Sequence, residues 1–296
     1  MAIPGANTWK ASIWNAIVKS GLWRLPGVAT ASTLFWRITK SNSAGLVMTE
    51  FRNCKLLVDP KDLSVSLEVL FFKDYSGADA IEREVKPGMV IADVGANIGC
   101  LALIASKSVG DAGIVYAFEP QPRSYEILEM NSRLNMRRNV IPIKKAVSNK
   151  KGTTRLYSCE KHLGQSSLVE ANVGSWTGYC EVETITLDDF FLGAHEGNSI
   201  PDLLIVDTQG AEGLVLEGAD KLIRTRFPKM ILEFCPYALR NFGTDPEQLL
   251  RRIEDYGYRI RYAKSGVATD ASEVLRVMSV SNASTIGNYL DLIFEK

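Results

Sequence analysis

The sequence predicts an α/β protein with a doubly wound, Rossmann-like sheet of about seven strands. From Met89 onward, short apolar runs alternate with helix-like segments, the pattern of βαβ units that form a parallel sheet with right-handed crossovers. The first of these runs ends in an acidic, glycine-spaced turn that leads into a helix, as at the ligand-binding edge of such sheets. A helical N-terminal extension and a small strand-rich insertion complete the predicted architecture.

The predicted elements follow in a regular order along the chain. β-like runs at 46–51, 55–58 and 65–72 precede a helical pattern at 77–85, which stops at Lys86-Pro87-Gly88. The sheet strands are predicted at 89–94, 113–118, 139–143, 202–207, 229–234, 257–262 and 288–294. Helices are predicted at 98–108, 121–135, 211–226 and 246–255.

The pattern changes between about 145 and 200. Shorter strand-like pieces at 154–157, 165–169 and 180–185 are followed by Leu-Asp-Asp-Phe at 187–190. Ligands of open α/β sheets bind outside the carboxyl ends of the strands. We therefore expect this insertion to lie near an acceptor molecule.

The N-terminal segment differs in charge from the rest. From Met1 to Thr49 the chain has no Asp or Glu, but five Lys or Arg residues and four of its five Trp residues. We predict a basic helical extension over 1–45 and a main domain over 46–296. The extension either packs on the domain as a helical layer or contacts an anionic membrane surface through residues 1–40. No transmembrane span and no signal-peptide pattern are expected there.

The amino-acid composition indicates which classes of partner and cofactor to expect. The 34 basic and 34 acidic side chains balance, so no overall field would attract a polyanion, and nucleic acid is not the expected partner. The five cysteines are scattered without a CxxC pair, which favours a reducing cytoplasm. With only two histidines, His162 and His195, no metal site is predicted.

The strongest motif is the turn DVGANIG at 93–99, which follows a buried strand. Its glycines let a ligand approach the backbone, and the next helix offers free N–H groups. A dinucleotide fingerprint needs G-x-G-x-x-G for its pyrophosphate, whereas this turn has only Gly95 and Gly99 and begins with Asp93. A carboxylate there repels a pyrophosphate and suits the ammonium and sulfonium of S-adenosylmethionine (SAM).

The next predicted strand ends at Glu119, which lies 20 residues after Gly99. An acidic side chain at that place can accept hydrogen bonds from both hydroxyls of a ribose. Glu119 disfavours NADP but is compatible with NAD, so an NAD-linked oxidoreductase stays open at this point.

An ordered set of motifs resembles the FkbM family of SAM-dependent methyltransferases. The resemblance spans about 89 to 234 and implies a class I methyltransferase fold with SAM as cofactor. Its motifs are DVGANIG at 93–99, AFEP at 117–120, AVSN at 146–149, TITLDDF at 184–190, LLIVDTQGAE at 203–212, VLEGA at 215–219 and MILEF at 230–234.

The resemblance also implies the cofactor-binding residues. The predicted SAM contacts are Asp93, Gly95, Ala96, Asn97 and Gly99 around the methionine part, Glu119 at the ribose, Pro120, Ala146 and Val147 near the adenine, and Asp207 facing the same crevice.

Methyl transfer to a hydroxyl calls for orientation and a nearby base. Asp207 is the first candidate base, followed by Glu233 and His162. Asp207 is alternatively a helix N-cap, and the other two are alternatively a structural acid and a surface residue. We expect O-methylation of a small-molecule or glycan acceptor.

The chain departs from the family pattern where Ile205 and Gln209 replace a usual Lys and Glu. This departure affects the acceptor site more than the SAM site, and it leaves a non-catalytic SAM-binding module as an alternative.

Overall fold

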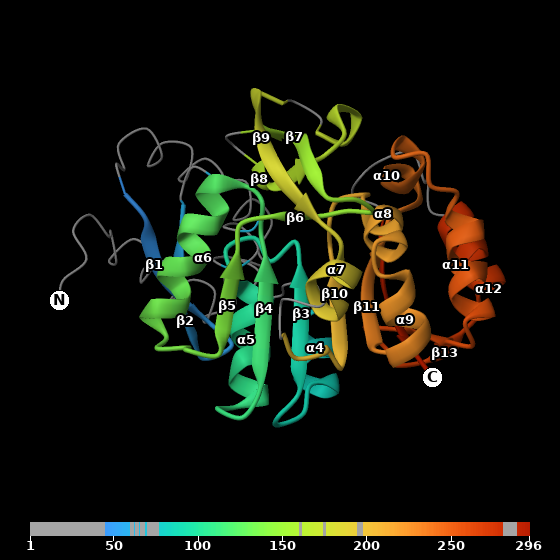
Figure 1. The fold of residues 1–296 in the computed structure, drawn as a ribbon, viewed down its shortest axis with the longest axis horizontal. Helices are drawn as coiled ribbons and strands as arrows, with labels where there is room; N and C mark the ends of the chain where they lie inside the picture. The colour runs from blue at the N-terminus through green and yellow to red at the C-terminus, as the bar shows by residue number, and fades with distance from the viewer. Residues whose placement is uncertain are drawn as a thin grey trace, which may run out of the picture.

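The computed structural model describes residues 45–59, 62, 65, 69, 77–159, 162–173, 176–193, 198–280 and 289–296. The predicted extension at 1–45 and His195 thus lie outside the described residues, except for Gly45. A large sheet runs through the centre of the described chain, with helices on both faces and a smaller sheet above its carboxyl edge (Figure 1).

Eight strands form the large sheet, in the order β13-β12-β14-β11-β10-β3-β4-β5. The five neighbours from β11 to β5 are all parallel. This core confirms the doubly wound fold that the alternating pattern predicted. The strands are β3 (Val90–Val94), β4 (Ile114–Phe118), β5 (Val140–Ile143), β10 (Leu203–Val206), β11 (Lys229–Phe234), β12 (Arg259–Tyr262), β13 (Ala268–Thr269) and β14 (Leu290–Glu295).

At one edge the sheet departs from the parallel arrangement that the alternating pattern predicts. The last strand, β14, inserts between β11 and β12 and runs antiparallel to both. β13 in turn pairs antiparallel with β12 as a short hairpin. Strand direction depends on pairing between residues far apart in sequence, so the apolar pattern of a single strand does not reveal it.

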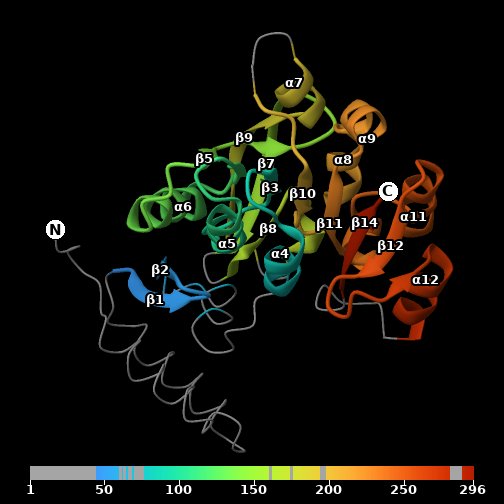
Figure 2. The same ribbon diagram turned by 90° about the horizontal axis from the view of Figure 1, so that it is seen from below.

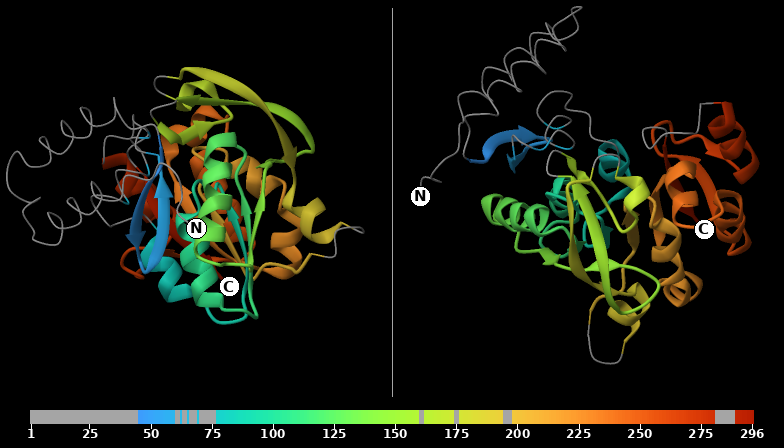
Figure 3. Two further views of the ribbon diagram at one scale, coloured as in Figure 1. Left: turned by 90° about the vertical axis from the view of Figure 1, so that its left-hand side faces the viewer. Right: turned by 90° about the horizontal axis from the view of Figure 1, so that it is seen from above.

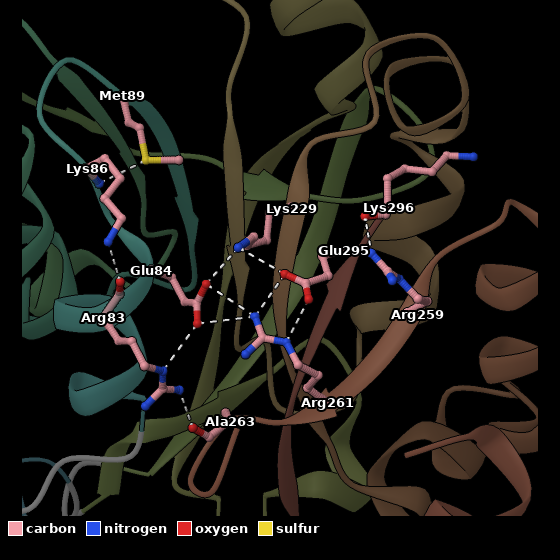
Figure 4. A network of polar contacts seen from close by, with 10 residues as sticks. All are labelled: Arg83, Glu84, Lys86, Met89, Lys229, Arg259, Arg261, Ala263, Glu295 and Lys296. Carbon is pink, nitrogen blue, oxygen red and sulfur yellow. Dashed lines mark hydrogen bonds and ion pairs between the residues drawn. The ribbon is translucent and has the colours of Figure 1, made fainter. Parts of the chain in front are cut away.

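A charged network fixes the reversed strand at the amino edge of β11 (Figure 4). Because β14 runs antiparallel, its Glu295 ends beside Lys229, the first residue of β11, with 3.1 Å between Nζ and Oε2. Lys229 also lies 2.6 Å from Glu84, the last residue of α4, and Arg261 of β12 binds both acids. Four elements are thereby joined at the edge opposite the carboxyl ends.

Two layers of helices cover the faces of the sheet (Figure 2). In β3, Ile91 packs with the α4, α5 and α6 side, and Ala92 and Val94 pack with the opposite side, as the period of two along a strand requires. The first layer contains α4 (Ala78–Glu84), α5 (Cys100–Val109) and α6 (Pro122–Leu134), and the second contains α7 (Leu187–Leu192), α8 (Glu212–Glu217), α9 (Asp220–Arg226), α10 (Pro236–Asn241), α11 (Pro246–Asp255) and α12 (Ala271–Val280).

The single helix predicted at 211–226 is two helices, α8 and α9, which meet at Gly218. The Gly218 carbonyl accepts the N–H of Asp188 at 2.9 Å. A Cβ on Gly218 would lie 2.1 Å from the Ser148 carbonyl oxygen, so the helix breaks where two other segments press against its backbone.

A hairpin of β1 (Val47–Phe51) and β2 (Cys54–Val58) confirms the first two β-like runs. The buried Asn131 side chain of α6 anchors it, because its amide exchanges hydrogen bonds with the Leu57 N–H and carbonyl at 2.6 and 3.1 Å. The β-like run predicted at 65–72 is wrong at Val65 and Val69, which are helical, and its other residues lie outside the described ones.

The insertion forms a second sheet in the order β6-β9-β7-β8, which confirms the short strands expected there. It rises over the carboxyl edge of the main sheet (Figure 3). Its elements are β6 (Ala146–Val147), β7 (Gly152–Cys159), β8 (His162–Ser167), the 3-10 helix η3 (Glu170–Asn172) and β9 (Gly178–Ile185).

Candidate functional site

The predicted turn after β3 has a backbone that requires glycine. Gly95 and Gly99 have φ of 88° and 90°, and Asn97 between them has 50°. A Cβ on Gly95 would lie 1.8 Å from the carbonyl oxygen of Asp207, and one on Gly99 would lie 2.6 Å from the Leu128 side chain. The spacing of the motif therefore reflects two close approaches, one to β10 and one to α6.

Glu119, at the tip of β4, holds this turn in place. Its carboxylate accepts the N–H of Asn97 and the N–H of Gln121, both at 2.7 Å. Burial raises the pKa of Glu119 to about 7, while the two backbone hydrogen bonds oppose the rise. Each carboxylate oxygen keeps lone pairs beyond these bonds, so the side chain retains the capacity to accept ribose hydroxyls.

Asp93 lies deep in the same place, with 2% of its surface exposed. Burial, together with the charges of Asp207 and Glu119, raises its pKa to about 8. Its Oδ2 atom and the Oδ1 atom of Asn97 are buried without a hydrogen-bond partner. Buried polar atoms of this kind call for a ligand that completes them.

Asp207 and Glu233 follow on the next two strands, β10 and β11. The Nε2 atom of Gln209 donates to Oδ1 of Asp207 at 2.9 Å and to Oε2 of Glu233 at 3.1 Å. Burial raises the pKa of both acids, and the charge of Asp207 raises that of Glu233 further. The structure thus brings the two first candidate bases together through one amide group.

The alternative role of Asp207 as a helix N-cap is wrong. Helix α8 begins after Ala211, which makes no side-chain cap hydrogen bond. Glu212, the first residue of α8, is fully buried, and its Oε1 accepts the N–H groups of Thr208 and Gly210 at 2.9 and 3.1 Å. Burial raises its pKa to about 7. Glu212 therefore shapes the loop that carries Asp207.

The remaining predicted residues lie farther along the carboxyl edge. Ala146 and Val147 are buried in β6, where they pair with Thr184 and Ile185 of β9, and Pro120 directly follows Glu119. Their proximity to an adenine stays a prediction. His162 begins β8 opposite Cys159, whereas the contact of β8 with the Asp207 loop comes from its other end.

Two residues of the insertion contact the site without any sequence signal. Ser167 Oγ and Asn172 Nδ2 donate to the carbonyl oxygen of Gln209 at 3.1 and 2.9 Å. Both side chains are buried, with 1% exposed. Their burial is the one feature that distinguishes them from other polar residues of the insertion. Burial depends on the tertiary structure, so the sequence could not reveal it.

Five carboxylates thus gather at one edge of the sheet: Asp93, Glu119 and Glu212 are buried, and Asp207 and Glu233 are half-buried. Within the described part of the chain, no Lys, Arg or His side chain forms an ion pair with any of them. Uncompensated buried acids are costly unless they bind a proton or a cation. This edge therefore fits a positively charged ligand and disfavours a pyrophosphate.

The comparison with protein families decides between the remaining possibilities. The model of the methyltransferase FkbM domain matches residues 93–260, more than half of the 296 residues. The chain belongs to the FkbM methyltransferase family. SAM is its methyl donor, and the residues present fit it, because the acidic edge complements a sulfonium and an ammonium.

Related proteins share shorter or more distant similarity. The ribosomal protein L11 methyltransferases of Bacillus cytotoxicus and Bacillus cereus strain Q1 are each 39% identical over 64 residues. The matched segment covers 22% of this chain and spans about a fifth, 20%, of the length of those relatives.

The solved structures that match this chain include an FkbM methyltransferase from Methylobacillus flagellatus KT. It has 13% identity and a TM-score of 0.42, with 73% of this chain and 49% of that chain covered. A putative rRNA-methylase from Clostridium thermocellum has 11% identity and a TM-score of 0.45, with 74% and 93% covered.

Proposed function

We propose that this FkbM-family methyltransferase methylates a hydroxyl oxygen of a sugar, a glycan or another small metabolite. The observation that carries the proposal is the acid pair of Asp207 and Glu233, which the Gln209 amide joins at the acidic carboxyl edge of the sheet. A hydroxyl must lose its proton as its oxygen attacks the methyl carbon, and a neighbouring carboxylate can accept that proton.

The donor, when bound, supplies a methyl group on a sulfonium with a good leaving group. The chain's task is to orient the acceptor oxygen in line with that methyl group, because proximity and orientation account for much of the acceleration. In the proposed roles, Asp93, Gly95, Ala96, Asn97 and Gly99 hold the methionine part, and Glu119 holds the ribose. Pro120, Ala146 and Val147 lie toward the adenine.

Among the candidate bases, Asp207 and Glu233 have the better support. Both are half-buried and share the amide of Gln209, and the charge of Asp207 also raises the pKa of Asp93. His162 is the third candidate, but the part of β8 that contacts the Asp207 loop is Ser167 rather than His162.

An aromatic cluster in the insertion favours a carbohydrate among the possible acceptors. The rings of Tyr157 and Trp176 lie 5.7 Å apart and those of Tyr157 and Tyr179 lie 5.9 Å apart. Trp176 is 42% exposed and Tyr179 is 50% exposed. Exposed rings of this kind can pack on the C–H face of a sugar while its hydroxyls bind polar groups.

The register of the insertion supports this placement. Tyr157 lies directly opposite Ser167 in the β7–β8 pairing, so their side chains project from one face of the small sheet. Ser167 Oγ reaches the carbonyl oxygen of Gln209 from that face. The rings therefore share a face with the contact to the Asp207 loop.

The experiment is methyl transfer from labelled SAM to a panel of monosaccharides, glycans, other hydroxylated metabolites and an RNA pool. We expect label in a hydroxylated small molecule or glycan, with the new methyl carbon bonded to oxygen by NMR. Glu233→Gln, which keeps the shape but removes one candidate base, should lower turnover while SAM still binds. Label in RNA alone, or on a nitrogen or carbon atom, would replace the proposed acceptor class.

A further inference from the structure

Gln209 makes an unusual double contact. One amide nitrogen donates to two half-buried carboxylates, Asp207 at 2.9 Å and Glu233 at 3.1 Å. An NH₂ group has two hydrogens, so both bonds can form at once. Because both acceptor oxygens bind the same nitrogen atom, the two carboxyl groups lie next to each other. Two carboxyl groups this close favour a state in which one of them carries a proton.

The backbone of Gln209 is held in a conformation that a non-glycine residue rarely adopts. Its φ is 54°, in the left-handed region, which is strained for a residue with a Cβ. The carbonyl of Gln209 accepts hydrogen bonds from Ser167 and Asn172 of the insertion. The Asn172 amide nitrogen also donates to the Ala238 carbonyl, and the Asn172 side-chain oxygen accepts a hydrogen bond from the Asn241 amide of α10. Three segments thus secure the residue whose side chain joins the acids.

The described titratable groups that act on the pair are mostly acidic. Asp291 of β14 lies directly opposite Glu233, and its charge acts on Glu233. The other titratable groups that face the pair are Asp93 of β3, Glu119 of β4, Glu212 of α8 and Cys235 after β11. No cationic side chain in the described residues forms an ion pair with either acid of the pair. Like charges so close cannot all ionise, which favours a retained proton.

We propose that Gln209 is a positioning residue that keeps Asp207 and Glu233 as one unit with a single shared proton. In this unit the unprotonated carboxylate is the acceptor for the proton that leaves the substrate hydroxyl. The O–H bond breaks, an oxygen–carbon bond forms, the carbon–sulfur bond breaks, and the proton passes to the pair. Transfer of the hydroxyl proton to the pair rests on the proposed function, whereas the pairing of Asp207 with Glu233 does not.

The test is a pH titration of the side-chain carboxyl carbons by ¹³C NMR, on the full chain with S-adenosylhomocysteine bound. Asp207→Asn and Glu233→Gln assign the two resonances. In the wild type, both resonances should follow the same two titration steps, as a coupled pair does. In Gln209→Met, which has a similar length but no donor, both steps should move up by about one pH unit, because each ionised carboxylate loses a hydrogen bond.

The matched control is Gln165→Met, the same substitution at an exposed position of β8, which should leave both titrations unchanged. Independent titration of the two carboxyls in the wild type would overturn the pairing, and this arm needs no variant. Steps that stay in place in folded Gln209→Met, even with a lower melting temperature, would overturn the role of Gln209. A coupled titration in a chain that methylates no hydroxyl would leave the pairing intact and remove the proposed function.

Discussion

The Glu119 carboxylate accepts the backbone N–H of Asn97 at 2.7 Å, so the tip of β4 fixes the turn that follows β3. The other oxygen of Glu119 accepts the N–H of Gln121 at the start of α6. One buried acid therefore organises two neighbouring βα connections and, in the proposed site, also faces the ribose.

Substitution of this acid should weaken donor binding without unfolding the chain. In Glu119→Gln, an amide N–H group faces one of the two backbone donors, and the charge is lost. We expect the affinity for S-adenosylhomocysteine, measured by calorimetry, to fall about tenfold to a hundredfold. Glu126→Gln, an exposed change in α6, is the control and should bind normally. Equal affinity in the two variants would argue against the role of Glu119.

Gly95 should tolerate no side chain. In Gly95→Ala, the new Cβ would meet the Asp207 carbonyl oxygen at 1.8 Å, so β3 and β10 must separate. We expect the free energy of unfolding to fall by about 3 kcal/mol in urea denaturation. Gly88→Ala is a matched control, because its φ of 81° is similar but nothing lies within 4 Å of the new Cβ. It should lose only about 1 kcal/mol, and a similar loss in both variants would contradict the close approach.

Donor binding should release protons at neutral pH. Without ligand, burial raises the pKa of Asp93 to about 8 and those of Glu119 and Glu212 to about 7. A bound cation favours the ionised carboxylates, so the affinity for SAM should rise with pH up to about 8. Calorimetry in buffers of different ionisation enthalpy measures the released protons.

S-adenosylhomocysteine lacks the sulfonium charge and serves as the control ligand. It should release fewer protons and show a shallower pH dependence. Equal proton release by the two ligands across this range would show that the sulfonium does not interact with the raised acids.

Glu84 should stabilise the fold at neutral pH and lose this contribution in acid. Burial raises the pKa of Glu84, but its hydrogen bond and ion pairs with Lys229 and Arg261 outweigh this and hold the pKa below its ordinary value. Its contribution is therefore present above pH about 4.5 and is lost as pH falls through the lowered pKa. Glu84→Gln should reduce the free energy of unfolding by about 2 kcal/mol at pH 7, and the difference should shrink toward pH 3.

Glu82→Gln in the same helix is the control for this change. Glu82 is 41% exposed and pairs with Arg52 at the surface. Surface ion pairs contribute about 0 to 1 kcal/mol, so its effect should be small at both pH values. A pH-independent loss in Glu84→Gln would show that packing, and not the ion pairs, is responsible.

The N-terminal extension remains a proposal, since residues 1–44 lie outside the described part of the chain. We propose that 1–45 form a unit separate from the SAM-binding domain. Deletion of residues 1–40 should leave SAM affinity unchanged and alter acceptor recognition or binding to anionic vesicles. A chain that no longer folds after the deletion would place the segment in the core. In the described residues, no helix has the length and apolar content to cross a bilayer.

The sequence alone determined the features that depend on local order. The alternation of apolar runs with helices gave the positions of the core strands, and the motif at 93–99 located the donor turn, because glycine spacing and strand period are local properties. The positions of Asp93, Glu119, Asp207 and Glu233 at strand ends followed from the same pattern.

The tertiary structure alone decided which of these groups meet. The reversal of β14, the break between α8 and α9 at Gly218 and the contact of Asn172 with Gln209 all join residues far apart in sequence. No local pattern encodes such contacts, since they depend on the order and direction in which the strands pair. The gathering of five acids at one edge, two of them joined by the amide of Gln209, is therefore a property of the fold.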